Sequence, residues 1–146
     1  MTRMIFVNLP VSDLSRSIAF YEAIGASKNE EFRDESSQAM MFSDSIWVML
    51  LDHQKFATFT PRAIPDAHQT SQVLLCLSAE SRDEVDATVS NAVTAGGRGD
   101  PGPTQDFGFM YGRSFEDPDG HIWELTWMDV EAGRAASAQA ATPVEA

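Results

Sequence analysis

The sequence has a single cysteine and few basic residues. Cys76 has no second cysteine to pair with, which excludes an intrachain disulfide and any cysteine-based zinc or iron–sulfur site. Ten Lys and Arg residues oppose 22 Asp and Glu residues, so the formal net charge is −12. A surface this acidic repels nucleic-acid phosphates and anionic lipid head groups. We therefore expect neither a nucleic acid nor a membrane as a partner.

Long apolar runs are also lacking. No segment approaches the ~18–20 apolar residues that cross a bilayer, and the first residues lack the pattern of a secretory signal. We therefore expect a cytoplasmic protein. The 146 residues are 43% hydrophobic and 22% charged, which is typical of one globular domain that can bury a core of its own.

The first part of the chain predicts a strand, a helix and three more strands. Apolar residues alternate over 5–11, which is the period of a strand. Asp13 then caps a helix whose apolar residues recur every three or four positions until Gly25 ends it. Further strands are expected at 28–32, 38–42 and 46–51, and the last is apolar enough to be buried on both faces.

The second part repeats this order. A strand is expected over 71–78, and Ser81 and Glu84 then fit a capping box at the start of a helix that Gly96-Gly97 ends. Strands are expected near Arg98, at 109–116 and at 122–128. The repetition predicts an α+β fold of two βαβββ modules in one domain.

The module boundaries follow from changes in composition. Module one is expected over about 4–51 and module two over about 70–128, within a domain of residues 1–128. The connection 52–69 is long, and long ordered loops often cover functional sites. From 129 to 146 the Ala-rich chain has no apolar period, which predicts a flexible or weakly helical tail.

Two motifs resemble a known family. One is Val11-Ser12-Asp13-Leu14 with the following helix, and the other is Phe115-Glu116-Asp117-Pro118-Asp119-Gly120-His121 leading into Trp123-Glu124-Leu125. Together with the paired modules, they resemble the vicinal oxygen chelate superfamily, which includes glyoxalases, extradiol dioxygenases, and bleomycin- and fosfomycin-resistance proteins. Within it, the chain is most similar to small bacterial proteins labelled predicted lactoylglutathione lyases.

The resemblance implies strands that curl into an open cup, a ligand inside the cup and a homodimer. Enzymes of the superfamily hold a divalent metal there with His or Glu residues. The matching positions in this sequence are Phe6, Met49, Gln72 and Glu124. Only Glu124 is a good ligand for a hard or borderline cation, and one carboxylate does not make a metal site. We therefore expect no metal and no other cofactor.

Glu124 is the candidate catalytic residue, as a proton acceptor or donor. It alternates with large apolar residues along its strand, so a carboxylate on a solvated face is the alternative. The apolar residues on the cup side would form a pocket floor, or simply belong to the core. The candidate ligand contacts are Phe6, Met49, Leu74 and the aromatic wall Trp47, with Asn8, Gln72 and Ser114 as polar groups. We expect Asn8 and Gln72 to be buried amides in need of a partner.

The predicted function is that of a metal-independent protein, similar to the bleomycin-resistance branch, that binds a small, partly aromatic, cationic or neutral molecule in the apolar cup or acts on it as a modest catalyst. The alternative is a divalent-metal-dependent lyase, isomerase or dioxygenase, with the metal on Glu124 and an unusual set completed by His53 and His68. Exposed loop histidines are the simpler interpretation of His53 and His68. Cys76 lies between two leucines with no basic neighbour, which favours a small buried hydrophobe over a nucleophile.

Overall fold

The computed structural model describes residues 1–141. The first module consists of β1 (Ile5–Val11), α1 (Leu14–Ala23), β2 (Ser27–Asp34), β3 (Ser37–Met41) and β4 (Ile46–Asp52). Its sheet has the strand order β1-β4-β3-β2, with β1 parallel to β4 and the other pairs antiparallel. The short helix α2 (His53–Phe56) follows β4 directly.

The second module repeats this topology. Its main elements are β5 (Leu75–Ser78), α3 (Arg82–Thr94), β6 (Arg98–Gly99), β8 (Met110–Glu116) and β9 (Ile122–Met128). The strand order is β5-β9-β8-β6, and the first and last strands are again parallel. The two-residue strand β7 (Gln105–Asp106) pairs with β8, and α4 (Val130–Ala141) follows β9. The predicted α+β fold of two βαβββ modules is confirmed.

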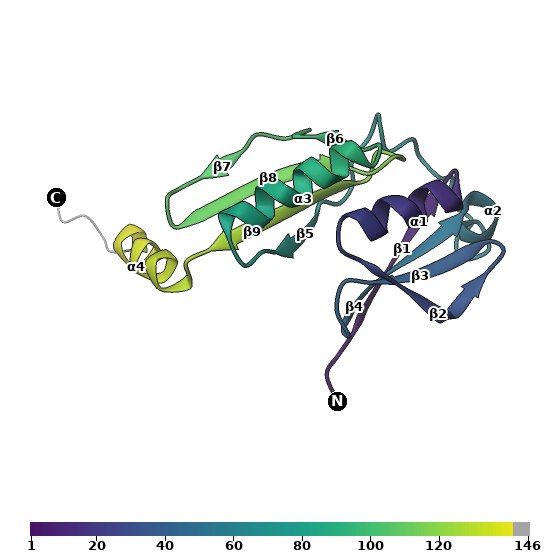
Figure 1. Cartoon of the computed structure of the whole chain (residues 1–146), viewed down its shortest axis with the longest axis horizontal. Helices are drawn as coiled ribbons and strands as arrows, with labels where there is room; N and C mark the ends of the chain where they lie inside the picture. The colour runs from purple at the N-terminus through teal and green to yellow at the C-terminus, as the bar shows by residue number, and fades with distance from the viewer. Residues whose placement is uncertain (142–146) are drawn as a thin grey trace.

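The modules lie side by side along the long axis of the molecule, with α1 and α3 in contact where they meet (Figure 1). The two sheets do not close into a barrel. One core runs through both modules, because residues of both belong to the same buried cluster. Fully or almost fully buried members include Phe20, Tyr21, Val48, Phe115 and Trp123.

Both long helices begin as their sequences predict. The Asp13 carboxylate accepts a hydrogen bond from the backbone N–H of Arg16 (3.1 Å), and the Ser81 hydroxyl accepts one from Glu84 (3.0 Å). The Glu84 carboxylate reaches back to the backbone N–H of Glu80 (2.6 Å), one residue before the helix cap. These local hydrogen bonds satisfy N–H groups that have no partner within the helix.

Several local predictions were wrong. Of the strand predicted over 71–78, only the last four residues form a strand, which is β5. Val73, which lies before β5, is 61% exposed. Cys76 is exposed rather than buried, because β5 buries only the face that carries Leu75 and Leu77. The helix α2 and the strand β7 were not predicted at all. The tail forms the helix α4 as far as Ala141, and the rest of the predicted tail lies outside the described residues.

Within residues 1–141, no helix combines the length and the apolar character that crossing a membrane requires.

Candidate functional site

Four predicted site residues share one face of the first sheet. Phe6 pairs with Trp47, and Asn8 pairs with Met49, in the parallel register of β1 and β4. The ring of Trp47 meets the rings of Phe6 and Phe32 edge-on, with centroids 5.3 and 5.8 Å apart. Phe6 is 51% exposed and Phe32 is 54% exposed, so this face of the sheet is open. We call it the first open face.

Trp47 itself is buried beneath these two rings. Its indole Nε1–H donates to the backbone oxygen of Asp44 (3.0 Å). The N–H is therefore engaged within the protein, and the outer rings of Phe6 and Phe32 form the exposed aromatic surface of this face.

The predicted residues of the second module lie around one face of its sheet. Glu124 on β9 stands between Ser114 on β8 and Cys76 on β5 in the register of the three strands. Glu124 is half-buried, and within the described part of the chain its carboxylate has neither a hydrogen bond nor an ion pair. Ser114 is buried, and its hydroxyl accepts a hydrogen bond from the backbone N–H of Gly102 (3.1 Å). We call the face that carries Glu124 the second open face.

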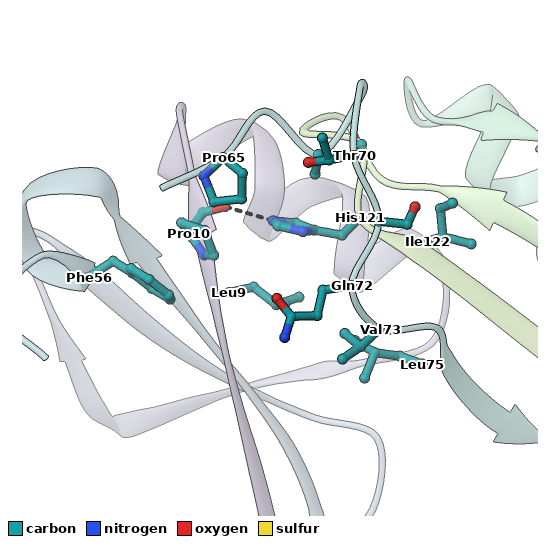
Figure 2. A pocket seen from close by; sticks show the side chains of 13 residues that line it. Leu9, Pro10, Phe56, Pro65, Thr70, Gln72, Val73, Leu75, His121 and Ile122 are labelled. Atoms are coloured by element: carbon teal, nitrogen blue, oxygen red, sulfur yellow. Dashed lines mark hydrogen bonds between the residues drawn. The ribbon is translucent and has the colours of Figure 1, made fainter. Parts of the chain in front are cut away.

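Two residues before β5 lie apart from this group. Leu74 is 56% exposed, and Gln72 lines a cavity at the junction of the modules (Figure 2). The expectation of buried amides was wrong, because Asn8 and Gln72 are both exposed. Over residues 1–141, no hydrogen bond or ring contact joins the predicted residues of one module to those of the other.

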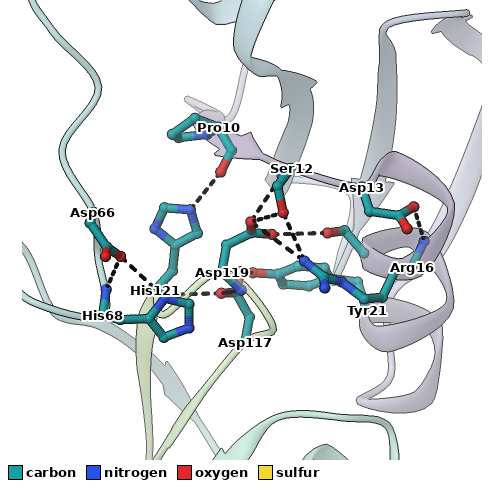
Figure 3. A network of polar contacts seen from close by, with 11 residues as sticks. Pro10, Ser12, Asp13, Arg16, Tyr21, Asp66, His68, Asp117, Asp119 and His121 are labelled. Atoms are coloured by element: carbon teal, nitrogen blue, oxygen red, sulfur yellow. Dashed lines mark hydrogen bonds and ion pairs between the residues drawn. The ribbon is translucent and has the colours of Figure 1, made fainter.

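The turn after β8 does more than set the register of a hairpin. The hydroxyl of Tyr21 on α1 donates to the Asp117 carboxylate (2.7 Å) and accepts from the indole Nε1–H of Trp123 (2.9 Å). The other carboxylate oxygen of Asp117 accepts from the backbone N–H groups of Asp119 (3.0 Å) and His121 (2.9 Å). A carboxylate that is 2% exposed thus ties the second module to the helix of the first (Figure 3).

Burial also determines the protonation chemistry of this pair. Burial, together with the neighbouring Asp117 carboxylate, raises the pKa of Tyr21 well above its usual range, so the phenol remains a donor near neutral pH. Burial raises the pKa of Asp117 as well, against the opposing effects of His121 and of the Tyr21 hydrogen bond. The pair is therefore a buried structural link that lies away from both open faces.

Asp119 and His121 add a second set of links between the modules. The Asp119 carboxylate accepts hydrogen bonds from the backbone N–H of Ser12 (2.9 Å) and from its hydroxyl (2.7 Å), and lies 3.6 Å from Arg16. The ring Nε2 of His121 lies 2.8 Å from the carbonyl oxygen of Pro10 (Figure 3). The family motif at 115–124 therefore joins the two modules as well as supplying Glu124.

The three histidines come together, but away from Glu124. His53, His68 and His121 line a cavity of about 300 Å³ beside the junction, and Glu124 is not part of its lining. His53 and His68 are exposed, as expected for loop histidines, and Asp66 lies 3.2 Å from the His68 ring.

The residues at the family's metal position do not fit a metal. Phe6 and Met49 offer no hard donor, and Glu124 is the only carboxylate among the four matching positions. Across residues 1–141, no group of three or more His, Cys, Asp or Glu side chains is arranged to hold a metal ion.

The topology and the motif place the chain in the class of paired βαβββ proteins. A family model described as the Glyoxalase/Bleomycin resistance protein/Dioxygenase superfamily matches residues 3–125, and the chain belongs to this superfamily. The resemblance found from the two motifs is thereby confirmed. No curated protein sequence matches the chain.

Solved structures support the same fold. A hypothetical protein from S. aureus is 28% identical, with a TM-score of 0.73 over 87% of this chain and 95% of that one. A glyoxalase/bleomycin resistance protein/dioxygenase family enzyme from Burkholderia phytofirmans PsJN is 18% identical, with a TM-score of 0.70 over 87% and 99%. The fosfomycin resistance protein FosX from Listeria monocytogenes is 19% identical, with a TM-score of 0.64 over 90% and 97%.

The sequence analysis missed the residues around the junction cavity. Phe56, His121 and Ile122 line it together with the predicted Gln72. The only signal in the sequence was the length of the connection 52–69 and its Phe and Pro residues, which suggested a loop that covers a site. Its partners on β1 and β9 are far away in the chain, so no local pattern could identify them.

Proposed function

We propose that the protein binds a small, partly aromatic molecule on its open sheet faces, without a metal at the family's position. The aromatic cluster of Phe6, Phe32 and Trp47 is the observation that carries this proposal. Its outer rings are more than half exposed, although large apolar side chains are usually buried where packing is their only role. Asn8 lies next to the cluster on the same face and offers both a donor and an acceptor.

The second open face would supply the polar chemistry. Glu124 has no partner in residues 1–141, so its carboxylate is free to accept a proton from a ligand or to bind a cation. Ser114 lies directly beside it on β8, whereas Leu74 and Gln72 lie before β5, apart from this face in one chain. The net charge of −12 favours a cationic or neutral ligand over an anionic one.

A homodimer would complete the pocket. In one chain both faces are open, and exposed apolar residues such as Phe6 and Leu74 lie on different modules. A symmetric pair is the commonest closed assembly of identical chains and would cover both faces. Light scattering at micromolar concentration should give the mass of two chains, and the mass of one chain would remove the dimer from the proposal.

Ligand binding is tested best with Trp47 as the reporter. Bleomycin is a cationic and partly aromatic probe, and it should change the tryptophan fluorescence of the wild type. The Phe6→Ala variant should bind at least tenfold more weakly. Ile5→Ala is the matched control, because Ile5 is 55% exposed and occupies the opposite face of the same strand. Equal binding by wild type and Phe6→Ala would place the ligand elsewhere.

The metal-dependent alternative makes the opposite prediction. A lyase, isomerase or dioxygenase of the glyoxalase type would hold a divalent metal through Glu124. Metal analysis of protein purified without an affinity tag should find no stoichiometric zinc, nickel, iron or manganese. Stoichiometric metal in the wild type that is lost in Glu124→Ala would overturn the metal-free proposal.

The double variant Phe6→His, Gln72→His tests the positions themselves. If the cup brings these positions together, two added imidazoles beside Glu124 should create measurable affinity for a divalent metal. A folded double variant that binds no metal would contradict the match between these positions and the family's ligand positions.

A further inference from the structure

The junction cavity is separate from both open faces. It has a volume of about 360 Å³, within the range of about 300–1,000 Å³ typical of ligand pockets. Figure 2 shows its two sides: Leu9 and Pro10 of β1 with Phe56 of α2 on one, and the segment from Thr70 to Leu75 with the start of β9 on the other. Both modules and the connection between them therefore contribute to its walls.

Among residues 1–141, the lining of this cavity carries no Asp, Glu, Lys or Arg. Its walls are mainly apolar side chains, and its polar groups are uncharged amides and hydroxyls and the ring of His121. The neighbouring cavity differs, because the carboxylates of Asp66 and Asp119 line it. The chain has a net charge of −12, yet this lining is uncharged. A charged ligand would lose its hydration here without gaining a counter-charge, so its binding is disfavoured.

Two polar side chains have unused hydrogen-bonding capacity. The carbonyl oxygen of Pro10 can only accept, so Nε2 of His121 carries the proton in their 2.8 Å hydrogen bond. In a neutral ring this leaves Nδ1 as an acceptor, and across residues 1–141 Nδ1 has no partner. The amide of Gln72 also has no partner in that part of the chain, and its side chain extends toward β1 (Figure 2).

We propose that the junction cavity is a second binding site, specific for a neutral, flat, mainly apolar molecule that carries one hydroxyl group, such as a phenol. The ring would contact the apolar walls, including Phe56, Leu75 and Ile122. The hydroxyl would donate to Nδ1 of His121 or bond to the Gln72 amide. Because both modules line the cavity, binding would also stabilise their junction.

The test uses p-cresol as the probe and nuclear magnetic resonance of the full chain. p-Cresol should shift the backbone amide signals of residues 70–75 and 120–122, and toluene, which lacks the hydroxyl, should bind about tenfold more weakly. Benzoate, which is charged, should not bind. Absence of shifts at the junction up to millimolar p-cresol, or equal affinity for toluene, would overturn the proposal.

Variants separate this site from the open faces. Val73 lines the cavity and is 61% exposed, so Val73→Trp should fold and block p-cresol binding. Val93→Trp is the matched control, because Val93 is 51% exposed on α3 and does not line the cavity. Gln72→Leu should weaken p-cresol binding without changing the urea midpoint of unfolding.

The two proposals can fail independently. p-Cresol binding that survives Val73→Trp, or that shifts the signals of residues 6–8 and 124 in place of the junction signals, would refute the junction site. Loss of bleomycin binding in Phe6→Ala with p-cresol binding unchanged would support two distinct sites.

Discussion

The two sheets have inner strands of similar length but differ at their edges: β1 and β2 of the first module have seven and eight residues, whereas β6 and β7 of the second have two each and lie next to arginine ion pairs. All seven residues of β4 are buried or half-buried between β1 and β3. The ion pairs of this module are peripheral, as in the 3.1 Å contact between Arg33 and Glu30, which are both more than half exposed. The ion pairs of the first module therefore lie outside the buried part of its sheet.

The second sheet ends in β6 and β7, which have two residues each. Arg82 donates two hydrogen bonds to the carboxylate of Asp106 on β7 (3.0 and 2.8 Å). Its guanidinium group also lies over the rings of Tyr111 and Trp127. Arg113 on β8 holds Asp100 with a similar fork (3.1 and 2.7 Å). The short strands of the second sheet thus have charge-assisted hydrogen bonds beside them, at Asp106 of β7 and at Asp100, the residue after β6.

The largest effect should come from removing the link between the modules. Asp117→Ala leaves the Tyr21 hydroxyl and two backbone N–H groups without an acceptor, and should lower the free energy of unfolding by about 4 kcal/mol. Urea unfolding measures this loss. Asp117→Asn is the control and should cost less, because its amide oxygen still accepts from the two N–H groups. A variant Asp117→Ala with an unchanged midpoint would show that the modules do not depend on this link.

The next effect concerns the contact between the connection and the turn. Gly120 has a φ of +93°, and an added Cβ would lie 2.6 Å from the backbone nitrogen of His68. Gly120→Ala should therefore cost about 2–3 kcal/mol, by strain and by displacement of the connection. Gly25→Ala is the matched control: its φ is +108° with open space around it, so strain alone should cost about 1 kcal/mol. Equal losses in thermal unfolding would mean that the connection does not rest on the turn.

The arginine comparison predicts a smaller effect. Arg113→Met in the second module should lower the free energy of unfolding by about 1 kcal/mol, because the Asp100 and Asp86 carboxylates lose a partner that is only 23% exposed. Arg33→Met in the first module should change it by less than about 0.5 kcal/mol, because both charges are exposed. Similar losses of unfolding free energy in the two variants would contradict this difference between the modules.

The smallest effect is a difference in acid titration. Hydrogen bonds from Ser36 and Ser37 lower the pKa of Asp34 to about 2, and Arg82 and the Gly108 N–H lower that of Asp106 to about 2. Both carboxylates thus stabilise the fold above their ordinary pKa of 3.8, and this stability is lost as the pH falls through about 2. The raised pKa of Asp117 acts in the opposite direction.

Salt should separate the two carboxylates. In a titration followed by nuclear magnetic resonance, 1 M NaCl should raise the pKa of Asp106 more than that of Asp34. Arg82 is the largest cause of the lowered pKa of Asp106, whereas Lys55, 3.7 Å from Asp34, contributes less to Asp34 than the serine hydrogen bonds, which salt does not screen. Equal changes in the two pKa values would mean that ion pairs contribute no more to the second module than to the first. Asp106→Asn should also flatten the loss of stability between about pH 4 and pH 2.

Much of the architecture could be predicted from the sequence because its signals are local. The caps at Asp13 and Ser81 and the turn before His121 act within a few residues, and strand alternation depends only on neighbouring positions. The resemblance to the family rests on the same local motifs together with the order of both modules. β5 was the weakest prediction, because apolar alternation continues through Val73 although no strand within residues 1–141 pairs with residues 71–74.

Only the tertiary structure determined which sheet faces are open. It also determined which residues meet at the junction of the modules. Phe6, Asn8 and Cys76 are exposed because each sheet packs its helix on the other face, and no pattern in one strand shows whether a second sheet covers it. The contact between His121 and Pro10 joins residues 111 positions apart. The sequence by itself thus determined the order of strands and helices in the two βαβββ modules. It also determined that Glu124 is the one carboxylate among the four positions that match the family's metal ligands. Only packing across the junction could decide that the motif around Asp117 ties the modules together beside an uncharged cavity.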